Sequence, residues 1–236
     1  MKYLPAALCA AALAVATGSC IIVVDETGRL MTHAAWEYDW HGEAIRGSGQ
    51  AATESREVAD FHRIELRGSA DAIVHVGATK GVSVTADDNL ISKVTTTVED
   101  GALIVGMERG NFRCKTDIVI EIGMPALEKL SLSGSGDVAI DGLAGSDLEL
   151  SISGAGDLQA TGTVEHLTAT VSGAGDMDLY GLTARNAKVK VSGAGDVEVT
   201  VLEKLEVTVS GAGDVNYRGT PQVDKHISGA GSVSRG

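Results

Sequence analysis

Aromatic side chains are scarce in this sequence. Phe, Tyr and Trp together make up 3% of its 236 residues. A sandwich of two sheets usually buries more large rings than this in its core, so the scarcity argues against a sandwich. It also argues against a polysaccharide-acting enzyme, because such enzymes combine clustered carboxylates with aromatic sugar platforms. We therefore expect no enzymatic activity and no catalytic residues.

Positive charge is also in short supply. The 19 Lys and Arg residues face 32 Asp and Glu residues, which gives a formal net charge of −13. Nucleic acids and anionic lipid surfaces attract proteins of the opposite charge. The composition therefore argues against both as partners.

The N-terminal apolar stretch is too short for a stable membrane anchor. It runs from Leu4 to Ala16 behind Lys2, whereas a spanning helix needs about 20 apolar residues. A basic start followed by a short apolar run is typical of an export signal. We expect residues 1–19 to be the signal peptide.

Two cleavage sites compete at the end of this signal. Thr17-Gly18-Ser19-Cys20 resembles a lipoprotein cleavage box, in which small residues precede a lipidated cysteine. Cys20 is then the lipidation site, and residues 20–54 are the tether that links the lipid anchor to the domain. The alternative is an ordinary signal-peptidase site at Ala14-Val15-Ala16, which would give a soluble secreted or periplasmic protein.

Cysteine is nearly absent from the rest of the chain. Cys9 would leave with the signal, so Cys114 is the only cysteine of the folded region. If Cys20 is not lipidated, a Cys20–Cys114 disulfide is conceivable. The simplest expectation for Cys114 is a small buried side chain.

Glycine, in contrast, is abundant and periodic. The motif Ser-Gly-(Ser/Ala)-Gly occurs six times in the second half of the chain, and five copies continue directly into Asp. The first glycines of successive copies lie 20, 19, 20, 18 and 18 residues apart. A fixed period near twenty indicates stacked repeats. The predicted structural turns contain Gly134 and Gly136, Gly154 and Gly156, Gly173 and Gly175, Gly193 and Gly195, Gly211 and Gly213, and Gly229 and Gly231.

The residues between the turns alternate between apolar and polar. Leu148, Leu150 and Ile152, for example, are separated by Glu149 and Ser151. A period of two indicates a strand with one buried face. We expect an all-β fold, a right-handed parallel β-helix or solenoid with rungs of 18–20 residues and an irregular, strand-rich N-terminal part. An antiparallel meander is the alternative.

The repeated turn has two interpretations. In the structural one, glycines permit positive φ and close stacking of backbones, a large side chain in place of Ala174 would not fit, and each Asp accepts local N–H groups. In the other, the acidic turns bind calcium, because stacked carboxylates favour a cation. The candidate metal ligands are Asp137, Asp157, Asp176, Asp196 and Asp214.

The two ends of the repeat array need protection. Residues 57–132 are strand-rich but lack the glycine signature, and we expect them to cap the first repeat. At the other end, Pro221 and Lys225 are residues of the kind that blunt an exposed sheet edge. A homo-oligomer that stacks through this edge is an alternative.

The chain resembles a bacterial envelope family described as "putative auto-transporter adhesin, head GIN domain". The segments Glu57–Gly68 and Val82–Leu90, the glycine turns, and the closing segments Gly219–Pro221 and Ser228–Val233 carry the resemblance. It covers residues 55–236. It implies a β-helical domain on a secreted or lipid-anchored protein, with no defined ligand and no catalytic residues to transfer.

These observations predict a non-catalytic exported protein of the bacterial cell envelope, an adhesion, interaction or scaffold domain. The partner would be a glycan or a protein that meets the regular lateral face of the repeats. The alternatives are a calcium-stabilised structural solenoid and a polysaccharide-acting β-helix enzyme.

The lipid anchor gives the first testable prediction. Cys20→Ser removes the thiol that would carry the lipid, so the protein should move from the membrane to the soluble fraction on cell fractionation. Cys114→Ser is the matched control and should leave the distribution unchanged. Persistent membrane association of Cys20→Ser would refute lipidation at this residue.

Overall fold

The computed structural model describes residues 23–24, 30–31 and 44–236. They fall into two units, Met1–Ala44 and Ile45–Gly236. In the first unit β1 (Val23–Val24) pairs in antiparallel fashion with β2 (Leu30–Met31). The predicted signal peptide and Cys20 lie outside the described residues. Within the described residues, no helix has the length and apolar character needed to cross a membrane.

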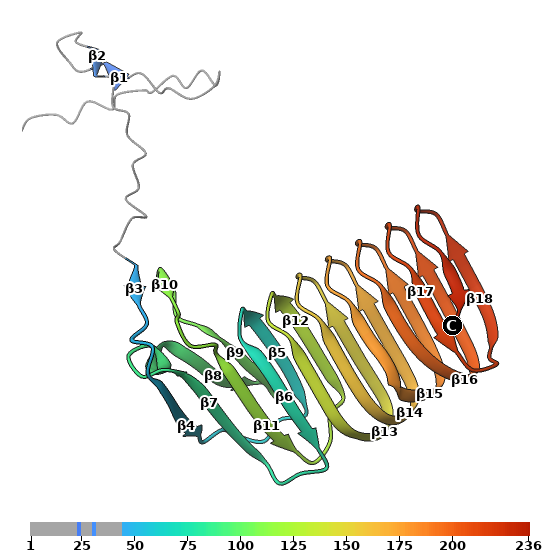
Figure 1. Cartoon of the computed structure of the whole chain (residues 1–236), viewed down its shortest axis with the longest axis horizontal. Helices are drawn as coiled ribbons and strands as arrows, with labels where there is room; N and C mark the ends of the chain where they lie inside the picture. The colour runs from blue at the N-terminus through green and yellow to red at the C-terminus, as the bar shows by residue number, and fades with distance from the viewer. Residues whose placement is uncertain (1–22, 25–29, 32–43) are drawn as a thin grey trace, which may run out of the picture. The chain divides into compact units, whose positions relative to one another are not determined.

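The second unit is all-β. Apart from a short pair formed by β3 (Ile45–Arg46) and β10 (Phe112–Arg113), its strands belong to one mixed sheet that does not close. The helical part of the described residues is one 3-10 turn, η1 (Ile91–Lys93). Four long parallel strands dominate the sheet and lie side by side (Figure 1). They are β13 (Val138–Ile152), β14 (Leu158–Val171), β15 (Met177–Val191) and β16 (Val197–Val209).

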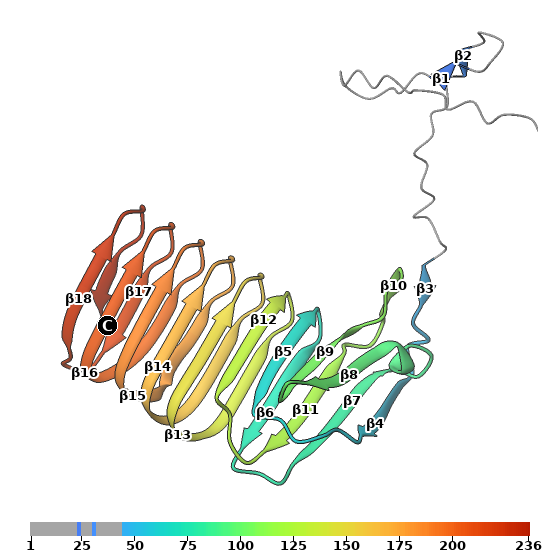
Figure 2. The same cartoon turned by 180° about the vertical axis from the view of Figure 1, so that it is seen from behind.

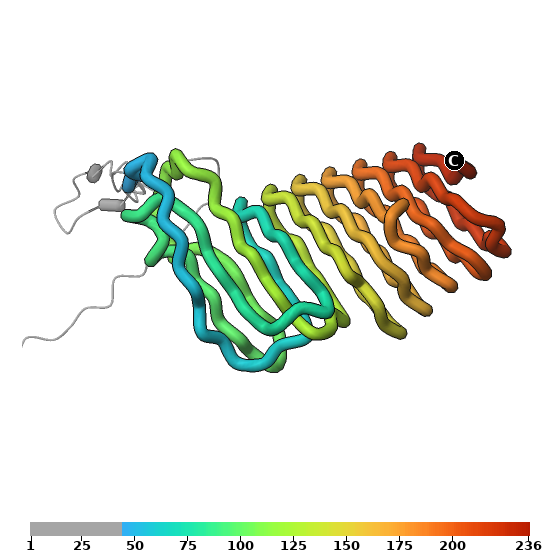
Figure 3. Tube along the Cα trace, turned by 60° about the horizontal axis from the view of Figure 1, so that its bottom comes forward, coloured from blue at the N-terminus to red at the C-terminus, as the bar shows by residue number. Residues whose placement is uncertain are grey.

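Each long strand has two halves with different neighbours. The first half of β13 pairs with β6 (Asp71–Val76), and its second half pairs with β12 (Lys129–Gly134). A register shift between Ile140 and Leu143 separates the halves. Figure 3 shows the chain bending back within each repeat. The halves therefore form two walls, which the glycine turns connect.

The two walls end on different strands at the C-terminal side. The first half of β16 pairs with β17 (Val215–Arg218), and β17 pairs with β19 (Val233–Arg235). The second half of β16 pairs with β18 (Gln222–Ile227). All these pairings are parallel, which rules out an antiparallel meander for the repeats.

The parallel register places equivalent side chains above one another in the core. Leu130 lies beside Leu150, then follow Ala169, Val189 and Val207. All five are buried, and the polar residues between them point outward. Because each repeat contributes only a few inward side chains, the core exists only when the repeats stack. The alternation predicted from the sequence is confirmed.

The N-terminal strands extend the same walls and then change direction. β5 (Arg63–Gly68) joins β12, and β9 (Ala102–Met107) joins β5, both in parallel. β8 (Val94–Glu99) is antiparallel to β9. On the other wall β11 (Val119–Met124) is parallel to β6 and antiparallel to β7 (Gly81–Asp87), and β4 (Ala51–Arg56) is antiparallel to β7. Figure 2 shows these strands at one end of the stack, where antiparallel pairing finishes each wall.

The glycines of the turns are required by the preceding repeat. A Cβ built on Gly173 would lie 1.8 Å from the carbonyl oxygen of Gly154, and one on Gly175 would lie 2.0 Å from that of Gly156. Gly173 and Gly175 do not have positive φ, so this part of the sequence interpretation is wrong for them. Positive φ occurs instead at the opposite corners, as at Gly142 (73°) and Gly219 (103°).

The alanine between the two glycines points to solvent. Ala174 is exposed, and its N–H donates to the carbonyl oxygen of Gly154 at 2.9 Å. The expectation that a large side chain would not fit at Ala174 is therefore wrong. The turns are crowded at the Cα atoms of the glycines and open at the alanine.

This difference gives a matched pair of substitutions. Gly173→Ala should lower the free energy of unfolding by about 3 kcal/mol, because the added methyl group meets backbone rather than a flexible side chain. Ala174→Leu, one residue away, should change it by less than about 0.5 kcal/mol. Thermal and urea unfolding measure both. Equal effects of the two substitutions would contradict the stacked turn.

Candidate functional site

An aspartate ladder runs along one side of the turns. The carboxylate Oδ1 of Asp137 accepts a hydrogen bond of 3.0 Å from the backbone N–H of Asp157, and Asp157 accepts one of 2.9 Å from Asp176. Asp196 and Asp214 continue the series, with bonds of 2.7 Å from each aspartate N–H to the preceding carboxylate. The ladder ends where the N–H of Ser232 donates to Asp214 at 2.7 Å. Each aspartate therefore fastens its own turn to the next one.

The ladder begins one repeat earlier than the glycine motif indicates. Asp71 accepts a hydrogen bond of 2.9 Å from the N–H of Asp137. The segment Gly68-Ser69-Ala70-Asp71 thus forms a first turn, beneath Gly134 and Gly136. The glycine motif does not reveal this turn, because Ala70 stands where the later turns have glycine. The feature of the sequence that could have revealed this turn is the spacing between Gly68 and Asp71, which equals the spacing between Gly134 and Asp137.

This arrangement supports the structural interpretation of the aspartates. Calcium takes six to eight oxygen ligands, whereas here the carboxylates stand in single file, one per repeat, and one oxygen of each already accepts an N–H. Within the described residues, no group of three or more His, Cys, Asp and Glu side chains is placed to hold a metal ion. The ladder accounts for the repeated position of aspartate in the motif without a bound cation.

The ladder gives a second matched pair. Asp176→Ala removes the acceptor for the Asp196 N–H and should cost about 1 kcal/mol of unfolding free energy. Asp176→Asn keeps an oxygen acceptor and removes one charge from the row, so its stability should equal or exceed that of the unaltered protein. Melting in EDTA and in millimolar calcium should coincide for all three. A calcium-dependent rise that Asp176→Asn abolishes would make the aspartates metal ligands.

The outer side of one wall is a regular surface, which we name the lateral face. It consists of the outward side chains of β5, β12, the second halves of β13–β16, and β18. Ammonium and carboxylate groups are paired on it: Lys129 contacts Glu149 at 2.8 Å, and Lys204 contacts Glu206. The hydrogen bond from Lys204, together with the charges of Lys204 and Lys188, lowers the pKa of Glu206. The lateral face is therefore rich in hydrogen-bonding groups.

Two adjoining hollows lie on this face. The larger has a volume of about 430 Å³ and the smaller about 220 Å³. His166 and Thr168 line both, and Asn186 approaches His166 with 3.5 Å between nitrogen atoms. The remaining lining residues are Glu128, Ser146, Asp147, Leu148 and Glu149 for the larger hollow, and Leu167, Asn186, Ala187, Lys188, Lys204 and Glu206 for the smaller. A ligand spanning both would contact β13 to β16.

A third hollow lies at the corners opposite the glycine turns. Its volume is about 400 Å³, and Leu202, 53% exposed, lines it. Arg185 crosses this hollow between two carboxylates, at 3.1 Å from Glu165 and 2.8 Å from Glu203. These hydrogen bonds raise the pKa of Arg185 and tie β14, β15 and β16 together.

The outer side of the other wall carries a few acidic residues. Asp178 accepts hydrogen bonds from Gln159 at 3.2 Å and from the N–H of Tyr180 at 3.1 Å. The guanidinium of Arg218 lies 3.7 Å from the centre of the Tyr180 ring. Burial and the carboxylate of Glu198 raise the pKa of Tyr180. Asp178 is therefore hydrogen-bonded to side-chain and backbone groups of its own wall.

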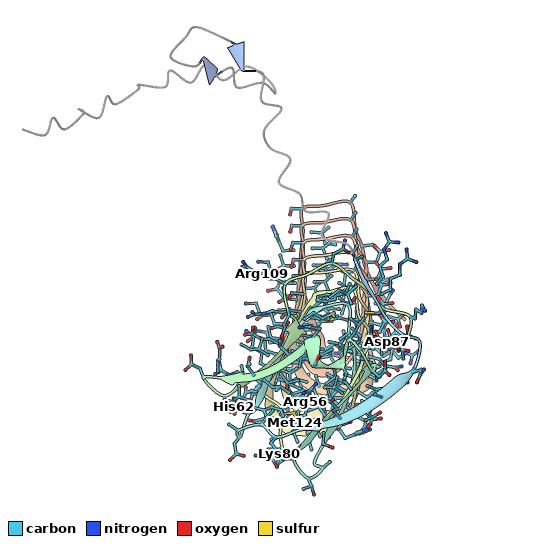
Figure 4. All side chains as sticks on the ribbon, turned by 90° about the vertical axis from the view of Figure 1, so that its left-hand side faces the viewer. Arg56, His62, Lys80, Asp87, Arg109 and Met124 are labelled. Atoms are coloured by element: carbon cyan, nitrogen blue, oxygen red, sulfur yellow. The ribbon has the colours of Figure 1, made fainter. Side chains whose placement is uncertain are left out.

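The one fully buried charged side chain of the described residues is Asp87. It accepts hydrogen bonds from the backbone N–H groups of Gly49 (2.7 Å) and Lys115 (2.8 Å) and from the Thr116 hydroxyl (3.0 Å). Burial alone would raise the pKa of Asp87. The hydrogen bonds together lower it by a larger amount, so the pKa of Asp87 lies below its ordinary value. Figure 4, which looks along the stack from the N-terminal side, labels Asp87 among the strands nearest the viewer. Asp87 holds two loops together.

Cys114 differs from its expected environment. The side chain is exposed rather than buried. Partial desolvation and the nearby Asp87 carboxylate raise the pKa of the Cys114 thiol, so little reactive thiolate forms at neutral pH.

Comparison with known families places the chain. The family model described as "Putative auto-transporter adhesin, head GIN domain" matches residues 60–221. The chain belongs to this family. The head GIN resemblance inferred from the glycine turns and flanking segments is thus confirmed, and it points to an exported or cell-surface protein. A comparison with curated proteins finds no match.

Solved structures share the head GIN fold. A "putative adhesin" from Bacteroides fragilis is similar with a TM-score of 0.67 and 21% identity, over 81% of this chain and 100% of that one. A "putative lipid binding protein" from Parabacteroides distasonis is similar with a TM-score of 0.51 and 23% identity, over 82% of this chain and 100% of that one. At these identities the likeness concerns the fold alone.

Proposed function

We propose that this protein is a non-catalytic surface-interaction protein of the bacterial cell envelope that binds glycans through its lateral face. The supporting observation is the pair of adjoining hollows around His166 and Thr168, where hydroxyl, amide, imidazole, carboxylate and ammonium groups lie within four neighbouring strands. Such a mixture of donors and acceptors suits the hydroxyl groups of a neutral sugar chain. Membership of the head GIN family supports adhesion as the wider role.

The composition of the lateral face favours a glycan over a protein. Protein interfaces concentrate their binding energy in buried aromatic and arginine anchors. The large apolar side chains that are exposed among the described residues are Ile45, Ile73, Leu202 and Ile227, and none of them points outward from the lateral face. A protein ligand would find no apolar anchor there.

The proposed function includes no enzymatic activity. A polysaccharide-cleaving site needs two carboxylates placed around the scissile bond, one of them with a raised pKa. Asp178 accepts hydrogen bonds from Gln159 and from the N–H of Tyr180. In each ladder aspartate, one carboxylate oxygen accepts a hydrogen bond from the backbone N–H of the next repeat.

The finer architecture belongs to the same proposal. Residues 129–236 would wind as a right-handed parallel β-solenoid whose rungs are the 18–20-residue repeats. The parallel registers that connect β12 to β18, offset by one repeat each, support this winding, and parallel crossovers are nearly always right-handed. Residues 55–236 would form the binding domain, and a lipid on Cys20 with residues 20–54 as tether would hold it in the envelope.

Glycan binding on immobilised glycan panels tests this function. His166→Ala combined with Asn186→Ala should weaken binding by about tenfold or more, because two polar contacts of about 1 kcal/mol each are removed. Gln159→Ala combined with Thr161→Ala, on the other wall, is the matched control and should bind like the unaltered protein. Absence of binding to any panel glycan, or equal losses in both double variants, would contradict a glycan site on the lateral face.

A further inference from the structure

Among the described residues, the outermost strands of the last repeat have a neighbouring strand on one side only. Within the described part of the chain, β18 (Gln222–Ile227) pairs with β16 alone, and β19 (Val233–Arg235) pairs with β17 alone. The N–H and C=O groups on the far side of β18 therefore have no strand partner there. An edge of this kind is a template for a further strand.

The core is also uncovered at this end. The register places Val223 on Leu205 and Ile227 on Val209. Leu205 and Val209 are fully buried, whereas Ile227 is 39% exposed and Val223 is half-buried. A strand added beside β18 would cover Val223 and Ile227 with its own inward side chains.

Two cations occupy inward positions of this last layer. Lys225 lies in register with Val207, at the end of the column that holds Leu130, Leu150, Ala169 and Val189 in the earlier repeats. Arg235 lies in register with Tyr217 on the other wall. Both are exposed, and neither forms a salt bridge with a described residue. The inward side chains along β18 are therefore apolar at Val223, cationic at Lys225 and apolar at Ile227.

This charge decides which occupant fits. If a second copy joined the edge through a two-fold axis at Lys225, the strands would run antiparallel, and Lys225 would face Lys225 of that copy. Like charges directly opposite one another destabilise a strand pair. A strand with a carboxylate at the same position would instead satisfy Lys225 and bury its apolar residues on Val223 and Ile227.

We propose that the β18 edge receives an extended acidic strand of a partner protein. The partner's backbone hydrogen-bonds to β18, its apolar side chains cover Val223 and Ile227, and its central carboxylate pairs with Lys225. Main-chain bonds supply affinity in this mode of recognition, and the alternate side chains supply specificity. This surface is separate from the lateral face, so it does not depend on glycan binding.

Blocked synthetic peptides test the proposal with the purified full-length chain. One peptide alternates threonine with valine and carries glutamate at its central inward position; a second carries lysine there; a third has prolines that remove the N–H groups needed by the edge. Fluorescence anisotropy should show the glutamate peptide binding at least tenfold more tightly than the other two. The order of the glutamate and lysine peptides should reverse in Lys225→Glu.

Two control variants test whether the effect on peptide binding is specific to the charge of Lys225. Lys80→Glu makes the same charge change beside Asp60, at the N-terminal strands, and should leave peptide binding unchanged. Lys225→Gln should weaken the preference for glutamate without reversing it. Failure of the glutamate peptide to bind, equal binding of the lysine or proline peptides, or a concentration-dependent dimer of the unaltered protein in sedimentation would overturn the proposal.

Discussion

The close approach of successive glycine turns is the constraint on which the rest of the structure depends. Neighbouring strands lie about 4.8 Å apart, and the backbone can keep this spacing around a corner only if no side chain stands between the turns. A Cβ on Gly193 would lie 1.8 Å from the carbonyl oxygen of Gly173. Because the turns sit directly on one another, the strands on both walls are held in the same register. The apolar columns and the outward rows follow from that register.

The glycine and the aspartate of each turn interact with different neighbouring repeats. Glycine is needed because of the repeat before it, since its Cα faces the preceding carbonyl oxygen. Aspartate is useful because of the repeat after it, since its carboxylate accepts the next N–H. The ends of the ladder obey this rule. The first turn has Asp71 but Ala70 in place of the second glycine, and the last has Gly231 but Ser232 in place of aspartate.

This rule explains how much the sequence could predict. The alternation of apolar and polar residues along strands such as Leu148–Ile152 identified the inward residues. Successive side chains of a strand point to opposite faces, and one face must be buried. The aspartate ladder was not predictable, since it joins groups one repeat apart and depends on the observed register. Ala174 was misjudged because the motif shows that a turn is tight but not which of its atoms are crowded. The first turn was missed because an end repeat lacks one of the two constraints that create the motif.

The same rule separates the fold from the binding properties of the surface. Turn glycines, ladder aspartates and inward aliphatic residues fix the backbone, so the outward residues of the lateral face are free to change at little cost to stability. His166 and Thr168 can therefore differ between related chains while the walls stay the same.

The hollows around those two residues are shallow, and each can enclose only part of a ligand, so a single contact is expected to be weak. Copies held side by side in one envelope would bind a repeating polymer much more tightly, because each further contact becomes intramolecular. A lipid anchor at Cys20 would supply that arrangement. Under the proposed glycan binding, tethering would raise the overall affinity above that of one lateral face.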